Sequence, residues 1–169
     1  MSNDQQHDYS QHYSRFHDLS FPCQFVVWAI RIWLRACCQS PELFAVLREA
    51  FDVLGLAEAG RTLDKGMSIL SVGTDKDLMF FGPDNEALSR DECDFLRVIE
   101  FFQAEAPKNA ETVLETWLPL AGTRTAGAIF NEYAGLLSRG GLNLLKSPKR
   151  KNRDPIFMRL GHLTRSSIH

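Results

Sequence analysis

The chain has 169 residues, of which 44% are hydrophobic and 24% are charged, a composition typical of a single globular domain. Its formal net charge of −2 conceals a strong asymmetry. Residues 1–145 carry 12 Lys/Arg and 20 Asp/Glu, a balance of −8, whereas residues 146–169 carry 7 Lys/Arg and one acid, a balance of +6. A basic block of this density usually contacts something acidic.

The placement of cysteine and histidine argues against several chemistries. The four cysteines include no C-x-x-C, so the spacing excludes zinc-ribbon and thioredoxin-like sites and favours reduced thiols in a cytoplasmic protein. No histidine lies between Asp18 and Gly161, which excludes a Ser-His-Asp or Cys-His site in the body of the chain. Residues 55–62 resemble a phosphate-binding loop, but Arg61 replaces its lysine and a predicted helix precedes it. We therefore predict no enzyme, no catalytic residue, no metal and no cofactor.

The N-terminal part contains one apolar stretch. Residues 1–18 are polar, and we expect a flexible arm and not a signal peptide. The apolar stretch that follows, Phe25–Cys38, is interrupted by Arg31 and Arg35. It is also shorter than the roughly 20 apolar residues that a membrane-spanning helix needs. We predict no transmembrane segment.

The first predicted helix runs from Pro22 to Cys38 and is apolar on nearly every side. Such a helix is either central in a bundle or covered by a partner. Arg31 and Arg35 in its polar stripe either face an anionic ligand or, as we favour, reach the surface or pair with acids at the core edge. In the partner alternative, large aromatic residues form the contact surface. These candidate partner-binding residues are Phe21, Phe25, Trp28 and Trp33.

The middle of the chain has one clear helix and one ambiguous segment. Ser40 and Pro41 are expected to start a second helix, which Gly55 can end. The apolar spacing in residues 57–82 favours a third helix followed by an extended stretch at residues 78–81. The alternative is a hairpin in which residues 67–72 pair with that stretch.

Three more helices are expected in the body. Ser89 to Glu92 reads as a capping box at the start of the first of them. Asn109 is expected to cap a shorter helix that Pro119 stops or kinks. The last is expected from about Thr125 to Ser138, closed by Gly140. The sequence thus predicts an all-α fold, a compact bundle of five or six helices with at most a minor β element near 67–82.

The chain therefore divides into a flexible polar arm (1–18), a helical domain (19–145) and a basic segment (146–169). Asp154 and Pro155 can start a short terminal helix in the basic segment. Its apolar residues are Ile156, Phe157, Leu160 and Leu163.

The basic run is the candidate site for anion or nucleic-acid contact. It consists of Lys146, Lys149, Arg150, Lys151 and Arg153. Within it, Ser147-Pro148-Lys149-Arg150 resembles the S-P-K/R-K/R units of histone-tail-like arms, which lie along the minor groove of DNA; this resemblance covers four residues. The run is expected to contact nucleic acid, an anionic membrane surface, an acidic protein or the chain's own acidic body.

The leading functional hypothesis is a non-enzymatic helical protein–protein interaction or regulatory module, with a protein partner or self-association as the main contact. It would use the apolar helix surface and the basic segment. One alternative is a nucleic-acid-binding regulator that acts through residues 146–153. A further alternative is peripheral association with an anionic membrane surface.

Overall fold

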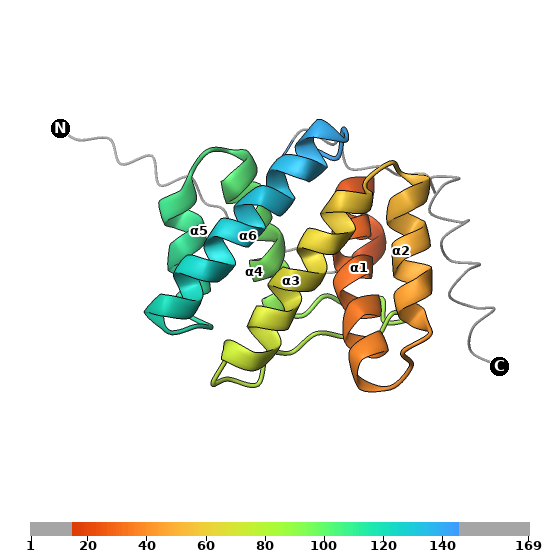
Figure 1. Cartoon of the computed structure of the whole chain (residues 1–169), viewed down its shortest axis with the longest axis horizontal. Coiled ribbons are helices and arrows are strands. Elements are labelled where there is room, and N and C mark those ends of the chain that lie inside the picture. Colours follow the sequence, from red (N-terminus) through yellow and green to blue (C-terminus); the bar gives the residue numbers. More distant parts are fainter. Residues whose placement is uncertain (1–14, 146–169) are drawn as a thin grey trace.

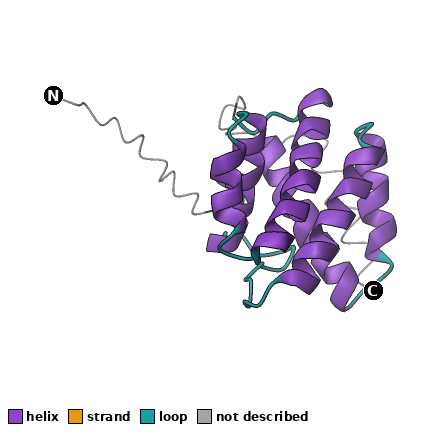
Figure 2. Cartoon of the chain, turned by 60° about the vertical axis from the view of Figure 1, so that its left-hand side comes forward, coloured by secondary structure: helices purple, strands orange, loops and turns teal. Residues whose placement is uncertain are grey.

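A computed structural model describes residues 15–145, which form six α-helices preceded by a single 3₁₀ turn (Figure 1). The 3₁₀ turn is η1 (Phe16–Asp18), and the helices are α1 (Phe21–Cys38), α2 (Leu43–Val53), α3 (Ala57–Gly73), α4 (Arg90–Gln103), α5 (Pro107–Leu114) and α6 (Leu120–Arg139). These residues contain no strand (Figure 2), only an isolated antiparallel bridge between Arg15 and Ala87. The predicted all-α bundle is confirmed.

The bundle is built around the antiparallel pair α3 and α6. Small residues let these helices approach closely: Gly66 lies against the ring of Phe130, and Gly140, just after α6, lies against Leu56, just before α3. Figure 1 shows α1 and α2 on one side of this pair and α5 on the other, and α4 packs against both α5 and α6. One continuous core of buried apolar side chains runs through all six helices.

Helix α1 is the central helix that its all-round apolar sequence allows. It begins at Phe21, one residue before the predicted start, and ends at the predicted Cys38. It is long and apolar enough to cross a membrane by length and composition alone, but a core helix passes the same test and 67% of the window is buried inside the bundle. The sequence left two alternatives for α1, a central helix of a bundle or a helix covered by a partner, and the structure has the first.

The ambiguous segment after α2 is helical. Helix α2 begins at Leu43 and not directly after Ser40, because Ser40 and Pro41 form a preceding turn whose carbonyls accept the first helical N–H groups. Gly55, at φ 69°, follows its end as expected. Helix α3 then confirms the favoured alternative over the hairpin. Residues 78–81 belong to a segment with neither helix nor strand.

Two further predicted boundaries are wrong, and proline explains both. The capping box of α4 forms as predicted, with Ser89 at the N-cap. Helix α5, however, begins at Pro107 and not after Asn109, because a proline at the first helical position has its φ already set for a helix. Helix α6 begins five residues before Thr125, since Pro119 is its N-cap as well as the stop of the preceding segment. The expected terminal helix after Asp154 lies outside the described residues.

Candidate functional site

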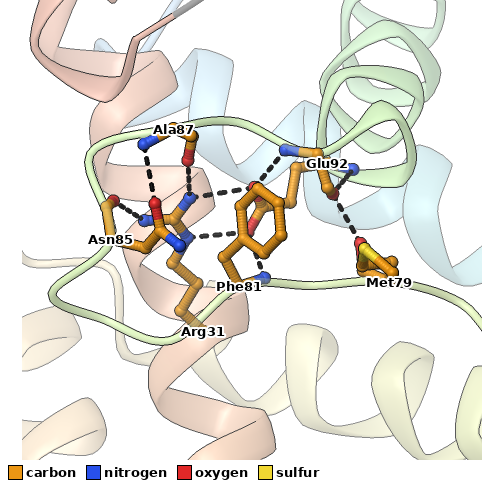
Figure 3. A network of polar contacts seen from close by, with 7 residues as sticks. Arg31, Met79, Phe81, Asn85, Ala87 and Glu92 are labelled. Carbon is orange, nitrogen blue, oxygen red and sulfur yellow. Dashed lines mark hydrogen bonds and ion pairs between the residues drawn. The ribbon is translucent and has the colours of Figure 1, made fainter.

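The most polar feature of the core is Arg31, whose side chain is buried in the middle of α1 with the residue only 2% exposed. Its guanidinium donates two hydrogen bonds to the carboxylate of Glu92 on α4, Nε to Oε1 at 2.7 Å and Nη2 to Oε2 at 2.9 Å (Figure 3). It also donates to the backbone carbonyls of Asn85 at 2.6 Å and Ala87 at 2.7 Å. A fork of this kind uses the planar geometry that distinguishes arginine from lysine.

The partner carboxylate of Glu92 is also fully used. Besides the two bonds from Arg31, it accepts the backbone N–H of Phe81 at 3.0 Å and that of Ser89 at 2.9 Å. The bond from Ser89 is half of the capping box of α4, so one carboxylate caps a helix and neutralises a buried cation. Because burying a charge is unfavourable unless it is paired and hydrogen-bonded, this complete set of partners explains why the pair is tolerated in the core.

The network joins three parts of the chain. The ring of Phe16 lies 5.4 Å from the Arg31 guanidinium carbon, and the N–H of Phe16 donates to the carbonyl of Glu86 at 2.7 Å. Arg31 thus holds the start of the described chain, the segment between α3 and α4, and the first turn of α4. Of the favoured alternatives, surface exposure or pairing with an acid, Arg31 has the second, and it has no face open to an external ligand.

The aromatic candidate residues lie mostly inside the bundle. Phe25 is fully buried and Trp28 and Trp33 are 4% and 3% exposed, while Phe21 is partly buried. Helix α2 covers two of them: Phe51 meets the ring of Phe25 edge-on at 5.0 Å, and Phe44 lies 6.2 Å from Trp33. The indole N–H of Trp33 donates to Asp64 on α3 at 2.6 Å. A partner protein could contact Phe25, Trp28 and Trp33 only if the bundle rearranged.

The five basic candidate residues lie outside the described part of the chain, but the place where their segment leaves the bundle is fixed. The amide of Gln103, the last residue of α4, donates to the carbonyl of Leu142 at 2.9 Å and accepts the N–H of Leu144 at 2.9 Å. Leu142 and Leu144 are both buried. The chain after α6 is therefore held against the bundle up to the residue before Leu145.

Two of the four cysteines, Cys23 and Cys93, are poorly suited to nucleophilic chemistry. Burial, with a smaller contribution from the charge of Glu100, raises the pKa of Cys23 to about 11. Burial and then the neighbouring acids also raise the pKa of Cys93. Thiols with raised pKa values stay protonated at neutral pH and are poor nucleophiles. Within residues 15–145, no three His, Cys, Asp or Glu side chains are grouped so that they could hold a metal ion.

The partly buried carboxyl of Glu100 gives a testable pH dependence. Desolvation raises its pKa above the usual range, so the native state keeps this proton to a higher pH than the unfolded chain. Unfolding stability therefore falls as pH rises through the interval between the two pKa values. We expect Glu100→Gln to raise the melting temperature at pH 7, and this advantage to shrink towards pH 4. Glu111→Gln, at an exposed position of α5, controls for the lost charge. An equal gain at both pH values would contradict the prediction.

Comparison of the chain with models of protein families, with curated proteins and with solved structures gives no match.

Proposed function

We propose that this chain is a non-enzymatic protein–protein interaction module in which a stable helical body presents the basic run of residues 146–153 to an acidic protein partner. The observation that carries the proposal is the charge division. Residues 15–145 carry 12 Lys/Arg and 18 Asp/Glu, and the basic run begins directly after them. Opposite charges steer association and select partners more than they add affinity, which is the behaviour expected of a recruitment segment.

Two structural features support this proposal. The buried charges of the core, Arg31 and Glu92, are fully taken up by each other and by the surrounding backbone. The Gln103 amide holds Leu142 and Leu144 against the bundle, so the chain is fixed in place two residues before the basic run begins. A run presented from a fixed point loses less freedom on binding than one on a long unanchored tail.

The test compares full-length chains that differ only in surface charge. The variant Lys149→Gln/Arg150→Gln/Lys151→Gln removes three bases from the run. The control, Lys65→Gln/Lys76→Gln/Lys108→Gln, removes three exposed bases from the body. With nuclease-treated extract, we expect the wild type and the control to capture the same acidic proteins and the first variant to lose them. Capture of the same proteins by both variants would exclude the basic run as the contact.

A nucleic-acid-binding role is the second candidate, favoured by the Ser147-Pro148-Lys149-Arg150 sequence. If five bases each neutralise a phosphate, log K should fall against log salt with a slope of about −4.5 on duplex DNA. The triple neutralisation in the run should reduce that slope by about 2.7. Failure to bind duplex or single-stranded probes at low salt would remove this candidate and leave the protein-partner proposal standing.

A further inference from the structure

Helix α2 has an outward face that no described part of the chain covers. It packs against α1 and α3 through one side only, and its buried residues are Leu43, Leu47, Ala50 and Phe51. Along another side, Glu42, Val46, Glu49 and Val53 follow at steps of four, three and four residues, the spacing of a single helical stripe. Val53 is 59% exposed and Val46 is partly buried, while both acids are exposed. The stripe thus alternates acidic and apolar side chains.

The C-terminal half of α2 carries two exposed acids, Glu49 and Asp52, against one exposed base, Arg48. Asp52 lies in the last turn, which contains no basic residue. The last carbonyl groups of a helix carry partial negative charge, so an acid in this turn is unfavourable and a cation beside it is favourable. Glu49 lies one turn earlier on the same exposed side. Among residues 15–145 neither acid forms an ion pair, although Arg48 lies one turn before Asp52.

The described chain comes to this same end of the bundle just before the basic segment begins. Gly140 lies against Leu56, which follows α2, and Figure 1 shows the ends of α2 and α6 at one end of the bundle. An extended chain covers about 3.3–3.6 Å per residue, so the eight residues after Leu145 reach up to about 28 Å. Neighbouring helix axes lie about 8–10 Å apart and α3 lies between α6 and α2, so the crossing takes about 16–20 Å, which is within this reach.

We propose that residues 146–163 of the same chain dock on this outer face of α2. Lys149 and Lys151 pair with Glu49 and Asp52, and the apolar residues that follow the run cover the valines of the stripe. Those apolar residues, Ile156, Leu160 and Leu163, repeat the four- and three-residue steps of the α2 stripe. The contact is autoinhibitory: while the run is docked on α2, its bases are withheld from an acidic partner. This regulatory role rests on the proposed function, whereas the docking itself does not.

Carbodiimide cross-linking of the full chain at low concentration tests the docking. A one-to-one mixture of unlabelled and ¹⁵N-labelled chains separates links within a chain from links between chains. We expect lysines of the basic run to link to Glu49, Asp52 or Glu42 within one chain, and these links to diminish at high salt. Overturning results are links mainly to acids of other helices, links only between chains, or no links to the run.

Charge reversal supplies the second readout. Glu49→Lys/Asp52→Lys repels the run, and Glu111→Lys/Glu115→Lys changes the net charge equally at exposed positions elsewhere. Using polyglutamate as the acidic probe, we expect the first variant to bind several-fold more tightly than the second, provided that circular dichroism shows both to be folded. Equal affinities would overturn autoinhibition. If the proposed function is wrong, no variant binds polyglutamate, but the intrachain cross-links remain. The docking and the proposed function can therefore fail separately.

Discussion

Arg31→Met is expected to lower the free energy of unfolding by about 3–5 kcal/mol, the usual effect of removing one partner from a buried ion pair. The loss is large because Glu92, which is fully buried, would keep its charge without a cation. The carbonyl groups of Asn85 and Ala87 would also lose their donors. Urea unfolding followed by circular dichroism measures the change.

A matched variant and a double variant identify the cause of this loss. Arg90→Met removes the 94% exposed arginine of the Arg90–Asp94 pair, 3.8 Å apart, and should change stability by no more than about 0.5 kcal/mol. Adding Glu92→Gln to Arg31→Met should cost less than the two single losses together, because no uncompensated charge remains. If Arg31→Met behaved like Arg90→Met, the network would not be holding the core.

Hydrogen exchange should locate the effect. The N–H groups of Phe81 and Ser89 are bound by the Glu92 carboxylate. In Arg31→Met these two amides should lose protection more than the amides of α3 and α6, whose pairing does not involve the network. Uniform loss across all helices would show instead that the network and the α3–α6 pair unfold as one unit.

The sequence was sufficient for the fold class because apolar periodicity and local caps agree along the chain. The capping box at Ser89 is a local signal, and it appears as expected. The helix boundaries at Pro107 and Pro119 were harder to predict, because a proline can stop one helix and start the next. Local sequence does not say which of these a given proline does, since that depends on how the neighbouring helices pack.

The site was only partly predictable, because its contacts join residues far apart in sequence. Arg31 was expected to reach the surface or to pair with an acid, but its partner Glu92 lies 61 positions later, and the predicted capping role already explained Glu92 locally. The apolar surface of α1 left two outcomes open, and only the packing of Phe51 and Phe44 over its aromatic residues decides between them. The role of Gln103 could not be predicted, because no sequence pattern marks a side-chain amide that hydrogen-bonds to a distant part of the backbone.

Gly66 lies in the middle of α3, where by helix propensity alone a glycine lowers stability. The structure gives it a reason: a Cβ at this position would lie 2.5 Å from Cε1 of the Phe130 ring. That ring is itself held edge-on against Phe95, with centroids 5.2 Å apart, so it has little room to move.

We expect Gly66→Ala to lower the free energy of unfolding by about 1–2 kcal/mol, because overpacking a core typically costs about 1–3 kcal/mol and offsets the helix propensity gained. Gly127→Ala is the matched control in α6. There the nearest atoms to a new Cβ are on Leu114 at 3.8 Å and Phe102 at 3.9 Å, an ordinary contact distance. This variant should therefore gain about 0.5–1 kcal/mol from helix propensity alone. Chemical denaturation of both variants measures the difference. If the two alanines stabilised the protein equally, the close approach of α3 and α6 at Phe130 would not be what requires glycine at position 66.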